Sequence, residues 1–417
     1  MGDVGKAERE IDARGLLILP GCIDLHTHLA STPAWTPLDG FATGTRAAIA
    51  GGVTTVVSMV YQEDGSLRHG VERALRDAAP AIADYAFHIV VVDPSDEAIA
   101  ELPGLVRDGH AGLKVFMVMK QFGERVTDFL RLYAAAKKNG MVVAVHAEDQ
   151  RFIADATAAL YAEGKTGVRY FPDSRPVEAE VVAVRQAVQH AEITGAWLYL
   201  VHLSSSRAVA ELAAAKRRGV TIYGETRPLY LYLTSAYFER EDAALWVGQP
   251  PLRGYDDVDA IWEALADRAL DCVATDHIPR SRADKMAPGL AFDKIPPGVS
   301  NLETLLPMLY SEGVRKKRIT VERLVELLAT TPARIAGLRT KGEVAVGKDA
   351  DLVLFDPERT RTITASELHS AADYDPYDGW TVTGWPRLVF LRGELAYDGV
   401  IRALPGSGRF VRREPAL

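Results

Sequence analysis

Five side chains of the types that bind divalent metals stand where apolar runs of the sequence end. His26 and His28 lie two residues apart in CIDLHTHL, so on a strand both imidazoles project from the same face. His146 ends the run VVAVHAE, His202 ends YLVHLSS and Asp276 ends CVATDH. Two histidines alone are commonly satisfied by hydrogen bonds, but five such groups at the ends of parallel strands would meet at one mouth of a barrel. The pattern predicts a metal site, because imidazole nitrogens and carboxylate oxygens are ordinary zinc ligands.

Lys114 lies in a further apolar run, GLKVFMV, where a bare ammonium group would be costly to remove from water. The residue could be a lysine whose amine reaches the surface, or one half of a buried ion pair. A third interpretation is a carbamate formed with CO2, which turns the cation into an anion able to bridge two metal ions. With two dications, this carbamate, Asp276 and a hydroxide bring the site close to neutrality. Lys114 is therefore a sixth candidate ligand.

Parallel strands are needed to position these residues, and the chain between residues 20 and 280 shows the alternation of strand and helix patterns that such strands require. Short apolar runs alternate with stretches in which apolar residues recur every three or four positions, such as Val126–Lys138 and Val177–Thr194. Eight such units predict an α/β fold with a closed (β/α)8, TIM-like barrel. An open doubly wound sheet is the alternative, but it calls for a glycine-rich turn after the first strand, where this chain has HTHL. The predicted strands are Gly21–His28, Val53–Val60, Tyr85–Asp93, Gly112–Val118, Met141–Glu148, Trp197–Ser204, Thr221–Thr226 and Asp271–His277.

The pattern changes from about residue 340 to short alternating segments separated by glycine and proline. These segments are KGEVAVG, DLVLFDP, TRTITA, GWTVTG, RLVFLRG and ELAYDG. They predict a small all-β domain, with which a strand-like run at Gly15–Leu19 could pair. The predicted divisions are residues 1–19 and 340–417 for the small domain and residues 20–339 for the barrel.

Composition limits the classes of protein to which the chain can belong. It has 417 residues, of which 48% are hydrophobic and 25% charged, as in globular proteins. The net charge is −8 and the basic residues are scattered, so we expect no nucleic-acid partner. No run of about 18 apolar residues predicts a membrane span. The two cysteines, Cys22 and Cys272, fit a reducing, cytoplasmic location. Each lies four residues before a candidate ligand, so both thiols should face the barrel interior.

The motifs together resemble the cyclic amidohydrolases, and most of all the hydantoinases and dihydropyrimidinases. The resemblance rests on LPGCIDLHTHL, LKVFM, HAE, SRPVEAE, VHLSS, GETRPLYL, QPPLR, TDHIP and the C-terminal KGEVAVGKDADLVLFDP with DYDPYDGWTVTG. It covers nearly the whole chain. It implies that the small domain is a β-sandwich formed by the two chain termini, of which residues 1–19 would be an incomplete first part.

The resemblance also implies a ligand set and a reaction. His26, His28 and Asp276 would bind one metal, His146 and His202 the second, and carboxylated Lys114 would bridge two divalent ions, zinc or alternatively manganese. Hydroxide would attack the ring carbonyl of a small cyclic amide, and Asp276 would carry the proton to the leaving nitrogen. The product would be an N-carbamoyl amino acid. The family also implies a homodimer or homotetramer.

Several substrate contacts depart from the family pattern. The tyrosine that usually follows the bridging lysine and stabilises the oxyanion is replaced by Met119. Gln249 stands for the usual serine before Pro-Pro-Leu-Arg, and Pro297 for the usual asparagine in IPPGVSNLE, in which Asn301 is a further candidate contact. These changes around an intact ligand set predict retained hydrolysis with altered ring specificity.

Alternative functions remain open at this point. Allantoin, a cyclic imide or a lactam could be the substrate of the same site, whereas Ala30 stands where dihydroorotases carry a carboxylate-binding arginine. A catalytically silent, dihydropyrimidinase-related scaffold protein would be expected to lose ligands, and this chain keeps all six candidates. A mononuclear deaminase would leave Lys114 without a role.

Overall fold

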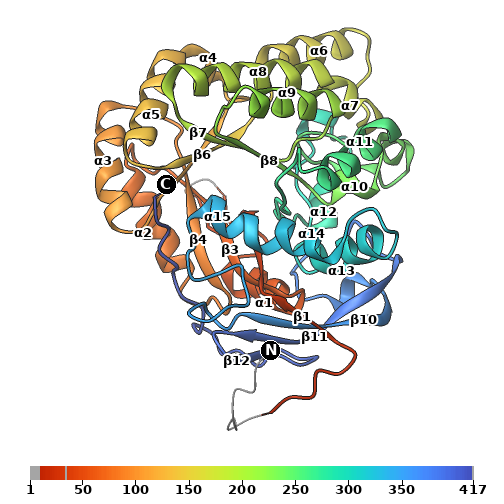
Figure 1. The fold of residues 1–417 in the computed structure, drawn as a ribbon. Helices are drawn as coiled ribbons and strands as arrows, with labels where there is room; N and C mark the ends of the chain where they lie inside the picture. Colours follow the sequence, from red (N-terminus) through yellow and green to blue (C-terminus); the bar gives the residue numbers. More distant parts are fainter. Residues whose placement is uncertain (1–9, 33–34, 416–417) are drawn as a thin grey trace.

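The computed structural model describes residues 10–32 and 35–415, and its core is a barrel of eight parallel strands (Figure 1). The strands neighbour one another in sequence order, and a parallel bridge between Thr27 and His277 joins the last strand end to the first. The closed barrel predicted from the eight apolar runs is therefore confirmed. Its strands are β2 (Cys22–Thr27), β3 (Val53–Tyr61), β4 (Asp84–Val90), β5 (Gly112–Phe116), β6 (Val142–His146), β7 (Trp197–Leu200), β8 (Ile222–Thr226) and β9 (Cys272–Val273).

Helices cover the outside of the barrel. Serine side chains cap three of them, as Ser66, Ser95 and Ser205 each accept a hydrogen bond from a backbone N–H of the first turn. The helices that directly precede the next barrel strand are α1 (Phe41–Ala50), α2 (Leu67–Asp77), α3 (Asp96–Arg107), α5 (Val126–Lys138), α8 (Val177–Thr194), α9 (Ser206–Arg217) and α11 (Tyr255–Ala266). Of these, α5 and α8 have the predicted bounds. The remaining helices are α4 (Lys120–Glu124), α6 (Gln150–Ala162), α7 (Phe171–Ser174), α10 (Leu229–Tyr232), α12 (Arg282–Lys285), α13 (Leu305–Leu309), α14 (Val321–Val325) and α15 (Thr331–Ala336).

A separate antiparallel sheet lies below the barrel in Figure 1 and is built from both ends of the chain. Its order is β1 (Leu17–Pro20), β10 (Leu352–Thr362), β11 (Thr381–Leu391) and β12 (Glu394–Tyr397). The predicted pairing of the N-terminal run is confirmed, because Leu17 lies opposite Phe355. The described residues supply one sheet of the expected sandwich, and residues 1–9 of its predicted first part, residues 1–19, lie outside them.

The six alternating segments form fewer and longer strands than predicted. DLVLFDP and TRTITA join in β10, which is bulged between Asp356 and Thr360, while GWTVTG and RLVFLRG join in β11. The prediction of a strand at KGEVAVG is wrong: this segment pairs with no strand among the described residues, and it exposes Val344 and Val346 to solvent.

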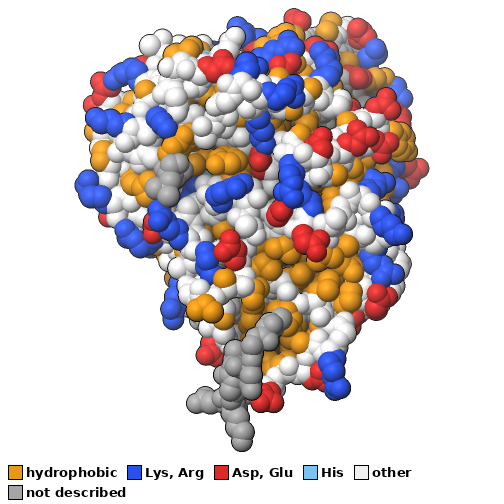
Figure 2. Space-filling model, viewed as in Figure 1, with side chains coloured by type: hydrophobic (Ala, Val, Ile, Leu, Met, Phe, Trp, Pro, Cys, Tyr) orange, Lys and Arg blue, Asp and Glu red, His pale blue; other side chains and the backbone are white. Residues whose placement is uncertain are grey.

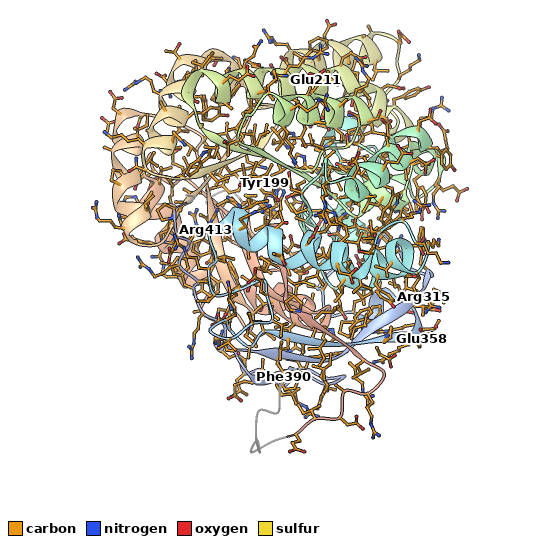
Figure 3. The ribbon with its side chains drawn as sticks, viewed as in Figure 1. Tyr199, Glu211, Arg315, Glu358, Phe390 and Arg413 are labelled. Carbon is orange, nitrogen blue, oxygen red and sulfur yellow. The ribbon has the colours of Figure 1, made fainter. Side chains whose placement is uncertain are left out.

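The small sheet and the C-terminal tail are both fastened to the barrel. The Tyr310 ring packs on the Phe355 ring of β10 with centroids 4.8 Å apart, and Arg315 donates to Glu358 at 2.8 Å (Figure 3). The tail then returns to the barrel, where buried Arg413 donates to the backbone oxygens of Phe87 at 2.7 Å and Ala336 at 2.9 Å. The boundaries at residues 19 and 339 stay a prediction.

The surface charge and the hydropathy of the helices also bear on the expectations from composition. Basic and acidic side chains are interspersed over the face shown in Figure 2. Within the described ranges, no helix combines the length and the apolar character needed to cross a bilayer.

Candidate metal centre

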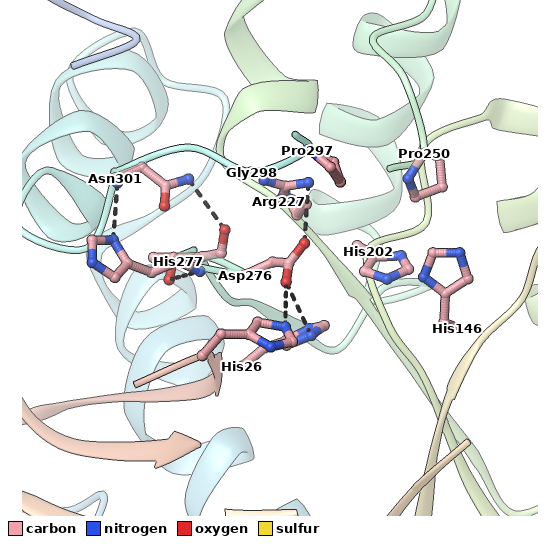
Figure 4. A network of polar contacts seen from close by, with 12 residues as sticks. His26, His146, His202, Arg227, Pro250, Asp276, His277, Pro297, Gly298 and Asn301 are labelled. Atoms are coloured by element: carbon pink, nitrogen blue, oxygen red, sulfur yellow. Dashed lines mark hydrogen bonds and ion pairs between the residues drawn. The ribbon is translucent and has the colours of Figure 1, made fainter. Parts of the chain in front are cut away.

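The predicted ligands converge at the carboxyl ends of the barrel strands. Five of the six, all except Lys114, lie on the wall of one cavity of about 160 Å³, although they come from four different strand ends. The ligand atoms of His26, His202 and Asp276 lie within 4.8 Å of one another. Figure 4 shows Asp276 pointing toward His26, with His202 and His146 alongside. The His146 and His202 ring centroids are 4.5 Å apart. The cavity is lined by His26, His28, Tyr61, Phe116, Val118, His146, His202, Arg227, Gln249, Asp276, Ile278, Pro297 and Gly298.

A bulge in β2 decides which of its side chains face the cavity. The register with β3 shifts between Asp24 and Thr27, so strict alternation fails just before His26. The prediction that Cys22 faces the barrel interior is wrong for this reason: Cys22 belongs to the cluster shared with the outer helices. Cys272 packs inside, as predicted, with its sulfur 3.4 Å from the Tyr199 hydroxyl.

Glu225 fixes the orientation of His26 from beneath. Its carboxylate accepts from Nδ1 of His26 at 3.0 Å, which leaves Nε2 facing Asp276 at 3.2 Å. The same carboxylate accepts from the His202 backbone N–H at 2.9 Å and from the Tyr199 hydroxyl, which Figure 3 places at the centre of the barrel. A carboxylate behind a ligand histidine selects the tautomer that presents the other nitrogen to a metal.

Glu148 holds His146 in the same way. Nε2 of His146 lies 2.7 Å from a Glu148 carboxylate oxygen, and Arg175 donates to that carboxylate through Nη2 at 2.6 Å and Nε at 3.1 Å. Burial lowers the pKa of His26, His146 and His202, so these imidazoles are neutral, which is the form that binds metal.

The amine of Lys114 is fully buried and has no hydrogen-bond partner among the described residues. Burial lowers its pKa from 10.5 to about 8. An orphaned amine of this kind, 4.8 Å from the ring centroid of the cavity residue Phe116, fits a carbamate better than it fits a structural ammonium group.

Among the described residues that line the cavity, Asp276 carries the only carboxylate. One of its oxygens lies 3.0 Å from Nε2 of His28, and the other lies 3.2 Å from Nη1 of Arg227. Although burial acts in the opposite direction, the neighbouring His26 and Arg227 hold the pKa of Asp276 well below its usual range. Asp276 and His202 both have left-handed backbone, with φ of 50° and 43°. Such strain is typical of functional positions.

Two of the four predicted substrate contacts line the cavity and two do not. Gln249 and Pro297 lie on its wall. Met119 precedes α4, where the chain turns away, and its side chain lines a separate hollow with Phe122 and Gln150. Asn301 is buried behind the site, where it donates to the Thr275 carbonyl oxygen at 3.2 Å.

Sequence reasoning missed Tyr61, Phe116 and Arg227 as cavity residues. The first two could have been found by the rule that located the ligands, because each ends a barrel strand. The signal for Arg227 was weaker: it directly follows β8, and only the fold brings it to Asp276.

Comparisons with known proteins agree with this geometry. The chain is 40% identical to a D-hydantoinase of Rhizobium radiobacter, over 99% of this chain and 92% of the relative. The crystal structure of a dihydropyrimidinase from Brevibacillus agri NCHU1002 superposes with a TM-score of 0.95 at 36% identity, covering 100% of this chain and 92% of that one. An L-hydantoinase from Arthrobacter aurescens gives a TM-score of 0.89 at 28% identity, covering 98% and 92%. The model of the amidohydrolase family matches residues 17–396, and the chain therefore belongs to that family.

Proposed function

We propose that this protein opens the ring of a hydantoin or dihydropyrimidine by hydrolysing a ring amide C–N bond, with an N-carbamoyl amino acid as product. The observation that carries the proposal is the convergence of four imidazoles and Asp276 on one cavity at the barrel mouth. The unpartnered amine of Lys114 lies 4.8 Å from the ring centroid of Phe116, which lines the same cavity. Relatives over nearly the full length of the chain are named D-hydantoinase and dihydropyrimidinase.

The proposed centre holds two divalent ions, zinc or alternatively manganese. His26, His28 and Asp276 would bind one ion, His146 and His202 the other, and a CO2-derived carbamate on Lys114 would bridge them. The hydrogen bonds of Glu225 and Glu148 to the ligand imidazoles support this assignment. When bound, the metals supply Lewis acidity and lower the pKa of water at the site. Elemental analysis of metal-replete protein should give about two ions per chain.

The residues of the cavity would transfer the proton, exclude water and contact the substrate ring. Hydrolysis forms a bond from a water oxygen to the ring carbonyl carbon and breaks the C–N bond, while the nitrogen gains a proton. Asp276 is the one acid–base carboxylate on the wall, so it takes the proton from the attacking water and returns it to the nitrogen. The apolar side chains of Phe116, Val118 and Ile278 exclude water from the ring, and Gln249 lies where it can contact the ring edge.

The test is ring opening by metal-loaded protein on dihydrouracil, hydantoin, phenylhydantoin, allantoin, dihydroorotate and succinimide. We expect turnover of the first three, and the Asp276→Asn variant prepared in parallel controls for contaminating hydrolases. Activity restricted to allantoin or succinimide would mean that the protein performs the same hydrolysis on a different ring. No activity on any ring in protein that holds two metals would refute the proposal.

Two properties of the molecule accompany this proposal. Family resemblance supports a homodimer or homotetramer, which light scattering after gel filtration measures directly. The two free, buried cysteines support a reducing, cytoplasmic location.

A further inference from the structure

Met119 leaves the proposed reaction without its usual oxyanion donor. The family resemblance implies a tyrosine at this position, but here the residue is a methionine, which lines a hollow outside the cavity. Loss of one oxyanion donor lowers the rate by a factor of roughly 10²–10³. A retained activity therefore calls for a donor from elsewhere on the cavity wall.

Few described residues on that wall can donate a hydrogen bond once the candidate metal ligands are set aside. Arg227 is fully buried on the cavity wall, and its guanidinium nitrogens have no hydrogen-bond partner among the described residues. Its Nη1 lies 3.2 Å from Asp276, so its charge is paired with that carboxylate. The backbone N–H of Gly298 is already used, because it donates to the Val247 carbonyl oxygen at 2.9 Å. The neutral side-chain donors on the described wall, neither of them held in an ion pair, are Tyr61 and Gln249.

Tyr61 is held on the same side of the site as the bridging lysine. It is the last residue of β3, and its ring stacks on Phe116 with centroids 6.3 Å apart and planes inclined by 13°. Phe116 lies two residues after Lys114 on β5, and its own ring is 5.6 Å from that of His146. This stacking fixes the phenol ring at the edge of the ligand cluster.

The Tyr61 hydroxyl is available as a donor. Its side chain is half-buried, lines the cavity and has no hydrogen bond to any described residue. Burial, followed by the nearby Asp276 charge, raises the pKa of Tyr61, so the phenol keeps its proton. A phenol is also neutral, and a neutral donor stabilises a developing oxyanion without adding a fixed charge to the site.

We propose that the Tyr61 hydroxyl donates a hydrogen bond to the ring carbonyl oxygen as that oxygen becomes the oxyanion, in place of the side chain missing at Met119. The proton stays on the phenol throughout. Tyr61 is then a catalytic residue supplied by β3, whereas the family supplies its donor from the segment after β5. The inference rests on the proposed ring hydrolysis.

The experiment compares Tyr61→Phe with wild type, both metal-loaded, on hydantoin and dihydrouracil. Removing only the hydroxyl should lower kcat by roughly 10²–10³, with KM changed less than about threefold and the metal content unaltered. Tyr133→Phe is the matched control, because Tyr133 on α5 also has a buried hydroxyl with no partner but lies outside the cavity. Tyr133→Phe should retain wild-type kcat.

The outcomes separate this inference from the proposed function. A Tyr61→Phe enzyme with kcat within threefold of an active wild type would overturn the role of Tyr61 alone. So would a change confined to KM, or a loss of kcat in Gln249→Ala that Tyr61→Phe does not show. Wild type that holds two metals and opens none of the rings would overturn the proposed function and this inference with it.

Discussion

Replacing Lys114 by methionine tests its assignment as a carboxylated metal ligand, because the change should raise the stability of the metal-free protein but weaken metal binding. In protein stripped of metal and CO2, the buried amine destabilises the folded state, because burial lowers its pKa from 10.5 to about 8. That difference of about 2.5 units, at about 1.4 kcal/mol per unit, corresponds to roughly 3 kcal/mol of lost stability at pH 7. Methionine keeps much of the volume without the charge. We therefore expect metal-free Lys114→Met to be more stable than metal-free wild type by about 3 kcal/mol at pH 7.

The pH dependence follows from the direction of the shift. The folded pKa is lower than the unfolded one, so the penalty is fully present below pH 8 and disappears as pH rises toward 10.5. The stability difference between the two proteins should therefore shrink to roughly 1.4 kcal/mol at pH 9.5. Urea unfolding of both metal-free proteins at pH 7 and pH 9.5 measures it.

Metal binding should change in the other direction. Lys114→Met cannot form a carbamate, so the variant should hold fewer ions than wild type and lose most activity. Small carboxylates should partly restore activity in the smaller Lys114→Ala variant, where they have space to bind. Equal stabilities of the metal-free proteins at pH 7, or a Lys114→Met protein with two ions and full activity, would refute the reasoning.

Three further predictions concern the surroundings of the ligands. Glu225→Gln removes the carboxylate behind His26 and should weaken metal affinity by roughly 10–100-fold, measured by competition with a chelating dye; unchanged affinity would show that Glu225 does not orient the ligand. Asp276→Asn should keep bound metal but lose a factor of roughly 10²–10⁴ in kcat, and normal turnover would exclude its role in proton transfer. Removal of metal by a chelator should abolish ring opening and lower the melting temperature, and both should return with zinc; activity that survives complete removal would contradict a metal-dependent reaction.

The sequence located the candidate ligands because their signals are local. His26 and His28 share a strand face, and His146, His202 and Asp276 follow apolar runs that can be recognised without knowing what they pair with. Eight such runs alternating with amphipathic helices were enough to predict the closed barrel. The site and the fold therefore followed from patterns shorter than about 20 residues, in each of which burial dictates the residue types.

Long-range contacts decided the side-chain directions and strand pairings that cannot be predicted from alternation within a single segment. The bulge in β2 turned Cys22 outward, and KGEVAVG found no strand to pair with among residues 10–32 and 35–415. Tertiary structure also placed Tyr61 on the cavity wall and directed Met119 away from it. The sequence determined which groups can bind metal, because that depends on residue type and period. Only the tertiary structure decided which neighbours face the substrate, because that depends on where distant strand ends and loops meet.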